Sequence, residues 1–132
     1  MNQDVIIAVI GAVLGSGLDK IYPKENIELA KKIIKSGGCL ISEYPVGTFA
    51  SKLNFPQRNR IISGLSNGVL VVEAGEKSGS LITADFALEQ GREVWAVPSD
   101  INKENSKGTN NLIKQGAKLI TSYEEILLDI II

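Results

Sequence analysis

The sequence contains no histidine and one cysteine, and these shortages exclude several kinds of site. Histidine is the side chain that most often serves as a general base or a metal ligand near neutral pH. The single cysteine, Cys39, forms no disulfide within the chain, which is usual in a reducing cytosol. The acidic residues show no metal-site spacing either. We therefore expect no metal site, and we expect Cys39 to be a small core residue.

The chain also has almost no excess of positive or negative charge, and it has few long apolar runs. The chain has 14 basic and 15 acidic side chains, so any affinity for nucleic acid requires a local patch of charge. The apolar run at 5–14 is too short to cross a bilayer. It also lacks the basic start and the cleavage site of a signal peptide. We expect no membrane partner and a cytoplasmic location.

Apolar segments alternate with helical patterns along the whole chain of 132 residues. The patterns predict strands at 5–14, 39–42, 69–72, 94–97 and 118–120, and helices at 27–34, 57–65, 81–90, 108–115 and 123–128. For the first half of 5–14, a buried helix is the alternative. This alternation predicts one α/β domain with a mostly parallel sheet of about five strands and helices on both faces.

Two arginines precede the predicted strand 69–72, and guanidinium groups suit phosphate oxygens. Arg58 and Arg60 are two residues apart on a helix, so they point in different directions. We expect at least one of them to contact a ligand, with Arg58 the preferred candidate. The alternatives are a solvated face or an ion pair with Glu43 or Glu73.

The segment Lys77-Ser78-Gly79-Ser80 starts a predicted helix directly after that strand. Main-chain N–H groups at a helix start favour an anion, so this turn is a candidate phosphate cradle. The alternative is a plain helix cap made by Ser80.

Small residues and aromatic residues complete the candidate site. Ser16 and Gly17 belong to an incomplete glycine motif, for which a tight turn at a strand end is the likelier interpretation on spacing alone. Phe49 and Phe55, near Lys52, are placed in a long loop at 44–56, where exposed rings can stack unpaired bases.

Eight segments follow one another in a recognisable order along nearly the whole chain: GSGLDKIYPKEN at 15–26, SEYP at 42–45, FPQRNRIISGLS at 55–66, VVEA at 71–74, SGSLITA at 78–84, GR at 91–92, AVP at 96–98 and GTNNLI at 108–113. In these segments the chain resembles the DprA/Smf family of bacterial DNA-processing proteins.

The resemblance implies a Rossmann-like domain that binds single-stranded DNA, delivers it to the RecA recombinase during natural transformation, and works as a homodimer without cofactor or catalysis. The implied DNA- or phosphate-binding residues are Ser16, Gly17, Lys52, Phe55, Arg58, Asn59, Arg60, Lys77, Ser78, Gly79 and Ser80. No equivalent of the family's earlier phosphate motif or its winged helix is found, so we expect a truncated single domain at 1–132, or a remnant of a mediator.

Two other functions stay open at this stage. The chain also resembles LOG-like phosphoribohydrolases, which carry a catalytic glutamate at the position of Thr83. A hydroxyl cannot replace an ionised carboxylate in acid–base catalysis, which disfavours an enzyme. A nucleotide-sensing module would also suit the near-neutral charge.

Overall fold

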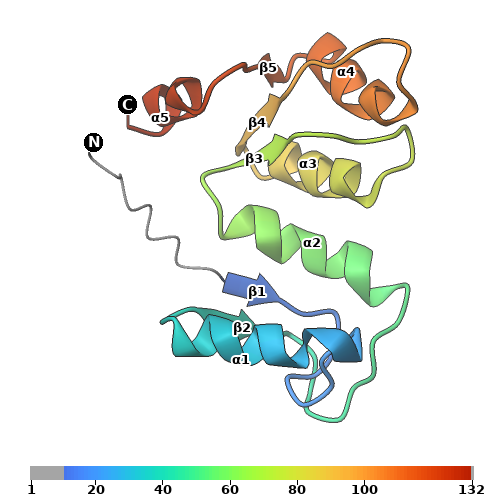
Figure 1. Ribbon diagram of the computed structural model, residues 1–132, viewed down its shortest axis with the longest axis vertical. Helices are drawn as coiled ribbons and strands as arrows, with labels where there is room; N and C mark the ends of the chain where they lie inside the picture. The colour runs from blue at the N-terminus through green and yellow to red at the C-terminus, as the bar shows by residue number, and fades with distance from the viewer. Residues whose placement is uncertain (1–10, 132) are drawn as a thin grey trace. The chain divides into compact units, whose positions relative to one another are not determined.

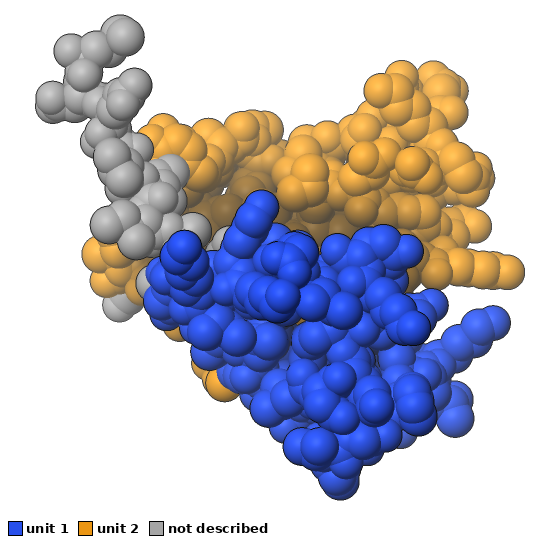
Figure 2. All heavy atoms as spheres, turned by 60° about the horizontal axis from the view of Figure 1, so that its bottom comes forward, with its two compact units in different colours: residues 1–58 blue, residues 59–132 orange. Residues whose placement is uncertain are grey.

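The computed structural model describes residues 11–131 (Figure 1), and the structural statements below concern those residues. The chain forms two compact units, Met1–Arg58 and Asn59–Ile132, which Figure 2 shows in blue and orange. No helix in the described range is long and apolar enough to cross a membrane.

The first unit contains a pair of parallel strands joined by a helix. Strand β1 (Gly11–Val13) pairs with β2 (Cys39–Ile41), and Gly11 lies opposite Cys39. A short 3-10 turn, η1 (Lys24–Asn26), leads into helix α1 (Ile27–Lys35). The part of the predicted first strand at 5–10 lies outside the described residues.

Helix α1 follows the predicted amphipathic pattern. Ala30 and Ile33 are buried, and its lysines face water. The helix ends before Gly37, whose φ of +86° is a left-handed conformation that favours glycine.

Cys39 does not lie in the core as expected, because its side chain is exposed. Its partner across the strand pair is Gly11, which has no side chain to cover it.

Helix α2 (Asn54–Gly64) starts three residues before the predicted position, and the boundary between the two units falls inside it. Pro56 lies in its first turn, where a missing N–H removes no helical hydrogen bond. Phe55 is therefore a helix residue, and only Phe49 of the two phenylalanines belongs to the loop.

The second unit is a three-stranded parallel sheet with three helices. The elements are β3 (Gly68–Val71), α3 (Gly79–Glu89), β4 (Glu93–Ala96), η2 (Glu104–Ser106), α4 (Lys107–Lys114), β5 (Lys118–Leu119) and α5 (Tyr123–Ile131). The strand order is β3-β4-β5. The predicted α/β fold with five parallel strands is confirmed, and the described strands divide into a sheet of two and a sheet of three.

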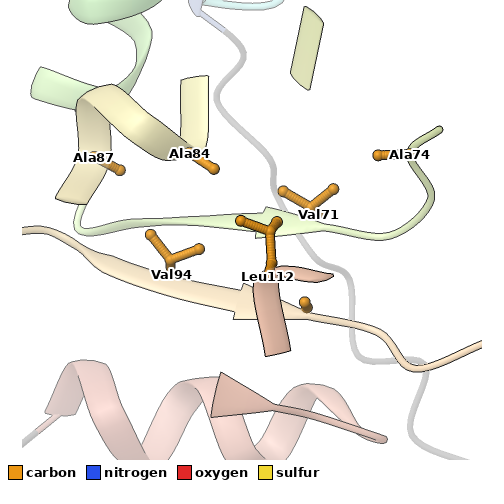
Figure 3. Close-up of a cluster of buried hydrophobic side chains, with 7 residues drawn as sticks. Val71, Ala74, Ala84, Ala87, Val94 and Leu112 are labelled. Carbon is orange, nitrogen blue, oxygen red and sulfur yellow. The ribbon is translucent and has the colours of Figure 1, made fainter. Parts of the chain in front are cut away.

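One face of the three-stranded sheet carries the main core. Figure 3 shows Ala84 and Ala87 of α3 pointing toward Val71 and Val94 of the strands. Leu112 brings α4 to the same cluster. Alanines at the contact let α3 lie close to the strands, and each buried valine or leucine stabilises the fold by about 1.5–3 kcal/mol.

On the other face of this sheet, α5 contacts Trp95. Side chains alternate along a strand, so Trp95 points away from Val94 and Ala96. Trp95 is 2% exposed, and its indole N–H donates to Asp129 of α5 at 2.7 Å. Each face of this sheet is therefore in contact with at least one helix.

Candidate functional site

In the first unit, the loops that follow β1 and β2 leave the same edge of the strand pair, since the strands are parallel. Hydrogen bonds fix these loops to each other. The N–H of Gly17 donates to the carbonyl of Thr48 at 2.9 Å, and the hydroxyl of Ser42 donates to the carbonyl of Ser16 at 2.6 Å. The two loops thus form one rigid surface at the carboxyl ends of the strands.

Ser16 and Gly17 hold this surface together from inside. Ser16 is 2% exposed, and its hydroxyl donates to the carbonyl of Lys20 at 2.7 Å. A side chain at Gly17 would collide with the carbonyl of Pro45 and the carboxylate of Asp19. These contacts match the tight turn that the spacing of this motif favours, while direct ligand contact by either residue stays a prediction.

The loops enclose a hollow of about 420 Å³, which we call the loop hollow. It is lined by Asp19, Lys20, Ile21, Tyr22, Lys24, Ile27, Phe49 and Ala50. Its walls combine two cations with two aromatic rings, and both rings are largely exposed: 62% for Tyr22 and 74% for Phe49. A flat apolar ligand with an attached anion would fit such a surface.

The ammonium group of Lys20 lies beside one ring of the loop hollow and one carboxylate. Nζ of Lys20 lies 4.9 Å from the centre of the Phe49 ring and 3.7 Å from the carboxylate of Asp19. The N–H of Gly47 donates to that carboxylate at 2.8 Å and, with Lys20 as a smaller contribution, lowers the pKa of Asp19. The hollow therefore holds a cation for phosphate, a ring for stacking and one anion at its margin.

A row of three side chains in contact, Tyr22, Phe55 and Arg58, connects the loop hollow to β1. The rings of Tyr22 and Phe55 have centres 6.0 Å apart, and Cζ of Arg58 lies 5.5 Å from the Phe55 ring. The Arg58 guanidinium donates to the carbonyl of Val13, and burial lowers the pKa of this guanidinium. Lys52 is exposed in the turn before α2.

In the second unit, Ser78 is the N-cap of α3. Its hydroxyl oxygen accepts the N–H of Ser80 at 3.4 Å, and the two hydroxyl oxygens are 2.7 Å apart. A helix cap is thus present, but Ser78 makes it and not Ser80, the residue that the alternative interpretation named. Lys77 and Gly79 are exposed, and a Cβ at Gly79 would meet no atom within 4 Å, so the helix start is open to an anion.

The two polar residues at the start of this unit have different surroundings. Asn59 is buried, and its amide donates to the carbonyl of Gly79 at 3.4 Å. Arg60 is exposed, and its carbonyl accepts a hydrogen bond from Gln90 at 2.8 Å. Asn59 therefore supports the start of α3.

Sequence reasoning missed Lys20, Tyr22 and Lys24 as members of the site. The available signal was the alternation of cations and an aromatic residue in the loop after the first strand. The predicted residues Ser16, Gly17, Lys52, Phe55 and Arg58 belong to the first unit, and the other six belong to the second.

Parallel strands, crossover helices and ligand loops at the strand ends define a Rossmann-like α/β protein. Residues 7–130 match the family described as DNA recombination-mediator protein A. The chain belongs to this family.

Relatives and solved structures agree with this assignment. Protein Smf of Escherichia coli is 57% identical over 116 residues, which are 88% of this chain and 31% of that protein. DNA processing protein DprA of Bacillus subtilis is 55% identical over 117 residues, 89% of this chain and 39% of that protein. The chain thus spans about a third of the length of these relatives.

Two solved structures of family members share the fold. DNA processing protein A from Streptococcus pneumoniae superposes with a TM-score of 0.79 at 47% identity, over 89% of this chain and 41% of that one. The Helicobacter pylori protein, described for its single-stranded DNA binding mode, gives a TM-score of 0.80 at 29% identity, over 92% of this chain and 55% of that one.

Proposed function

We propose that this chain binds single-stranded DNA in the loop hollow, without a chemical step. The observation that carries the proposal is a hollow of about 420 Å³ lined by two exposed rings and two lysines, namely Tyr22, Phe49, Lys20 and Lys24. Bases of a single strand are free to stack on such rings, whereas duplex bases are already stacked. Lysines beside the rings supply the cations that flanking phosphates need.

The family and one of its structures support the same proposal. The family is one of recombination mediators, and the Helicobacter pylori relative is described by its binding of single-stranded DNA. For the whole protein, we propose delivery of the strand to a RecA recombinase in natural transformation, as a homodimer in the cytoplasm. The open helix start at Lys77–Ser80 and the exposed cations Lys52 and Arg60 are proposed as further phosphate contacts.

We propose that no bond is made or broken at this site. Thr83 stands in α3 where a LOG-like phosphoribohydrolase would carry its catalytic glutamate. A threonine hydroxyl has no charge to stabilise a developing cation and is a poor general acid. Incubation with nucleoside monophosphates should therefore release no free base.

The test is fluorescence anisotropy with a labelled oligothymidine, with unlabelled single strand, duplex and mononucleotide as competitors. We expect the single strand to compete well and the other two poorly, with affinity falling steeply as salt rises. Lys24→Gln should weaken binding by about 1–3 kcal/mol, the usual range for a charge-assisted hydrogen bond.

The matched control is Lys35→Gln, which removes the same charge from the exposed end of α1, outside the hollow. It should bind almost as the wild type does. Equal competition by duplex would contradict the single-strand proposal, and equal competition by mononucleotide would favour a nucleotide-sensing module instead.

A further inference from the structure

We infer that Arg58 is a positioning residue that orients the aromatic wall of the loop hollow, and that it acts through Phe55 and Tyr22 rather than on phosphate. The inference rests on the proposed binding of single-stranded DNA in that hollow. Its physical basis is the row of contacts from Val13 through Arg58 and Phe55 to Tyr22.

The first step is the fixed position of the Arg58 guanidinium. It donates to the carbonyl of Val13, the last residue of β1. This carbonyl belongs to a strand end, so the hydrogen bond anchors α2 to β1. The Arg58 side chain is half-buried, and this burial lowers the pKa of its guanidinium. A group held in this way is poorly placed to move toward an incoming phosphate.

The second step is the contact by which the fixed guanidinium holds the Phe55 ring in place. The guanidinium carbon lies 5.5 Å from the ring centre, within the range of a cation–π contact. On another side the ring fills the space beside Gly15, where an added Cβ would approach it to 2.9 Å. Asn54 donates to the Gly15 carbonyl at 2.9 Å and holds the helix start against the same turn. Phe55 therefore has little freedom to rotate.

The third step brings Tyr22 into the row. Its ring centre lies 6.0 Å from that of Phe55, and the two planes are inclined by 41°. Tyr22 is 62% exposed and lines the loop hollow, so its orientation depends on few contacts. Phe55 is the aromatic contact that supports it. Loss of the Arg58 anchor would let Phe55 shift and would leave Tyr22 without a fixed stacking geometry.

The salt dependence of binding affinity distinguishes an arginine that contacts phosphate from an arginine that positions other side chains. A residue that neutralises a phosphate contributes about 0.7 to the slope of log affinity against log salt for a single strand. A positioning residue contributes affinity without contributing to that slope. A 2-aminopurine base in the oligothymidine adds a second readout, because stacking on an aromatic ring quenches its fluorescence.

The experiment compares the wild type with Arg58→Met, Arg58→Gln and Lys24→Met. Methionine keeps most of the arginine stem, and glutamine keeps an N–H donor for the Val13 carbonyl without charge. We expect Arg58→Met to weaken binding about tenfold, within the usual range for one stacked base, with an unchanged slope and less quenching. Arg58→Gln should recover a large part of the binding affinity and of the fluorescence quenching, again with an unchanged slope of log affinity against log salt.

Lys24→Met is the matched control, since it removes a cation that lines the hollow. Its slope should become shallower by about 0.7, while quenching at saturating protein persists. A slope that became equally shallow in both Arg58 variants, with full quenching, would overturn the positioning role and make Arg58 a phosphate contact. Failure of the wild type to bind oligothymidine would instead overturn the proposed function, and the inference with it.

Circular dichroism of each variant establishes whether the fold is intact. If Arg58→Met does not fold, Arg58→Gln decides alone, because the two roles predict different salt dependences for a variant with a neutral donor. An unchanged slope supports positioning, and a shallower slope contradicts it.

Discussion

The indole N–H of Trp95 and the ammonium group of Lys118 both donate to the carboxylate of Asp129, at distances of 2.7 Å from each side. These bonds join β4 and β5 to α5. The carboxylate has its pKa lowered first by Lys118 and then by Trp95. Asp129 therefore attaches the last helix to the sheet in its ionised form.

A pH-dependent loss of stability follows from this lowered pKa. Stabilisation by Asp129 is fully present above the pKa of an unfolded aspartate, about 3.9, and is lost as pH falls through the lower folded value. We expect Asp129→Asn to melt below the wild type at neutral pH. The difference in melting temperature should shrink on acidification below about pH 4, and a constant difference would contradict the explanation.

Substitution by alanine should have opposite effects on the unfolding free energy at two glycines that lie at helix starts, Gly108 and Gly79. A Cβ at Gly108 would lie 2.6 Å from the carbonyl oxygen of Ala74, so Gly108→Ala should cost about 1–3 kcal/mol of unfolding free energy. Gly79 has open space around it, so Gly79→Ala should be neutral or should stabilise α3 by up to about 1 kcal/mol. Chemical denaturation of both variants measures this, and equal effects would contradict the packing argument.

The start of α3 allows helix stability and DNA binding to be separated. Ser80→Asp places a negative charge near the helix N-terminus and should stabilise it by about 0.3–1 kcal/mol. The same charge should repel phosphate and weaken oligothymidine binding, as should Lys77→Glu. Normal binding by a folded Ser80→Asp variant would leave the turn as a structural cap only.

Ser99→Ala is the matched serine control for that comparison. The hydrogen bonds between Ser99 and Asn110 use the main chain of Ser99, so they survive the loss of the hydroxyl. The variant should therefore bind and melt as the wild type does.

Asp19 should limit affinity at the margin of the loop hollow. Asp19→Asn keeps an oxygen that can accept the N–H of Gly47 but removes the negative charge beside Lys20. We expect tighter oligothymidine binding and a greater affinity gain at low salt. Asp19→Ala loses the accepted hydrogen bond as well, and it should weaken the loop. Anisotropy titrations at two salt concentrations compare the two variants, and weaker binding by Asp19→Asn would contradict this role.

The order and type of the elements could be predicted from the sequence, because side-chain periodicity reflects which face of each element is buried. A cap at the start of α3 was also foreseeable, since a helix cap depends on residues that are neighbours in sequence, but it was assigned to Ser80 and the structure has it at Ser78. The start of α2 was predicted three residues late. A proline in a first turn looks like a helix breaker when the sequence is read alone.

The sequence by itself determined the α/β class, the parallel strands and the presence of cations beside a helix start, because these depend on local patterns. Only the tertiary structure decided which side chains meet. The loop hollow joins residues 19–27 to Phe49 and Ala50, and the Arg58 anchor joins α2 to Val13, 45 positions away. Such contacts depend on the paths of loops and on the direction of single side chains. Those are fixed by contacts between distant segments, and no local pattern encodes them.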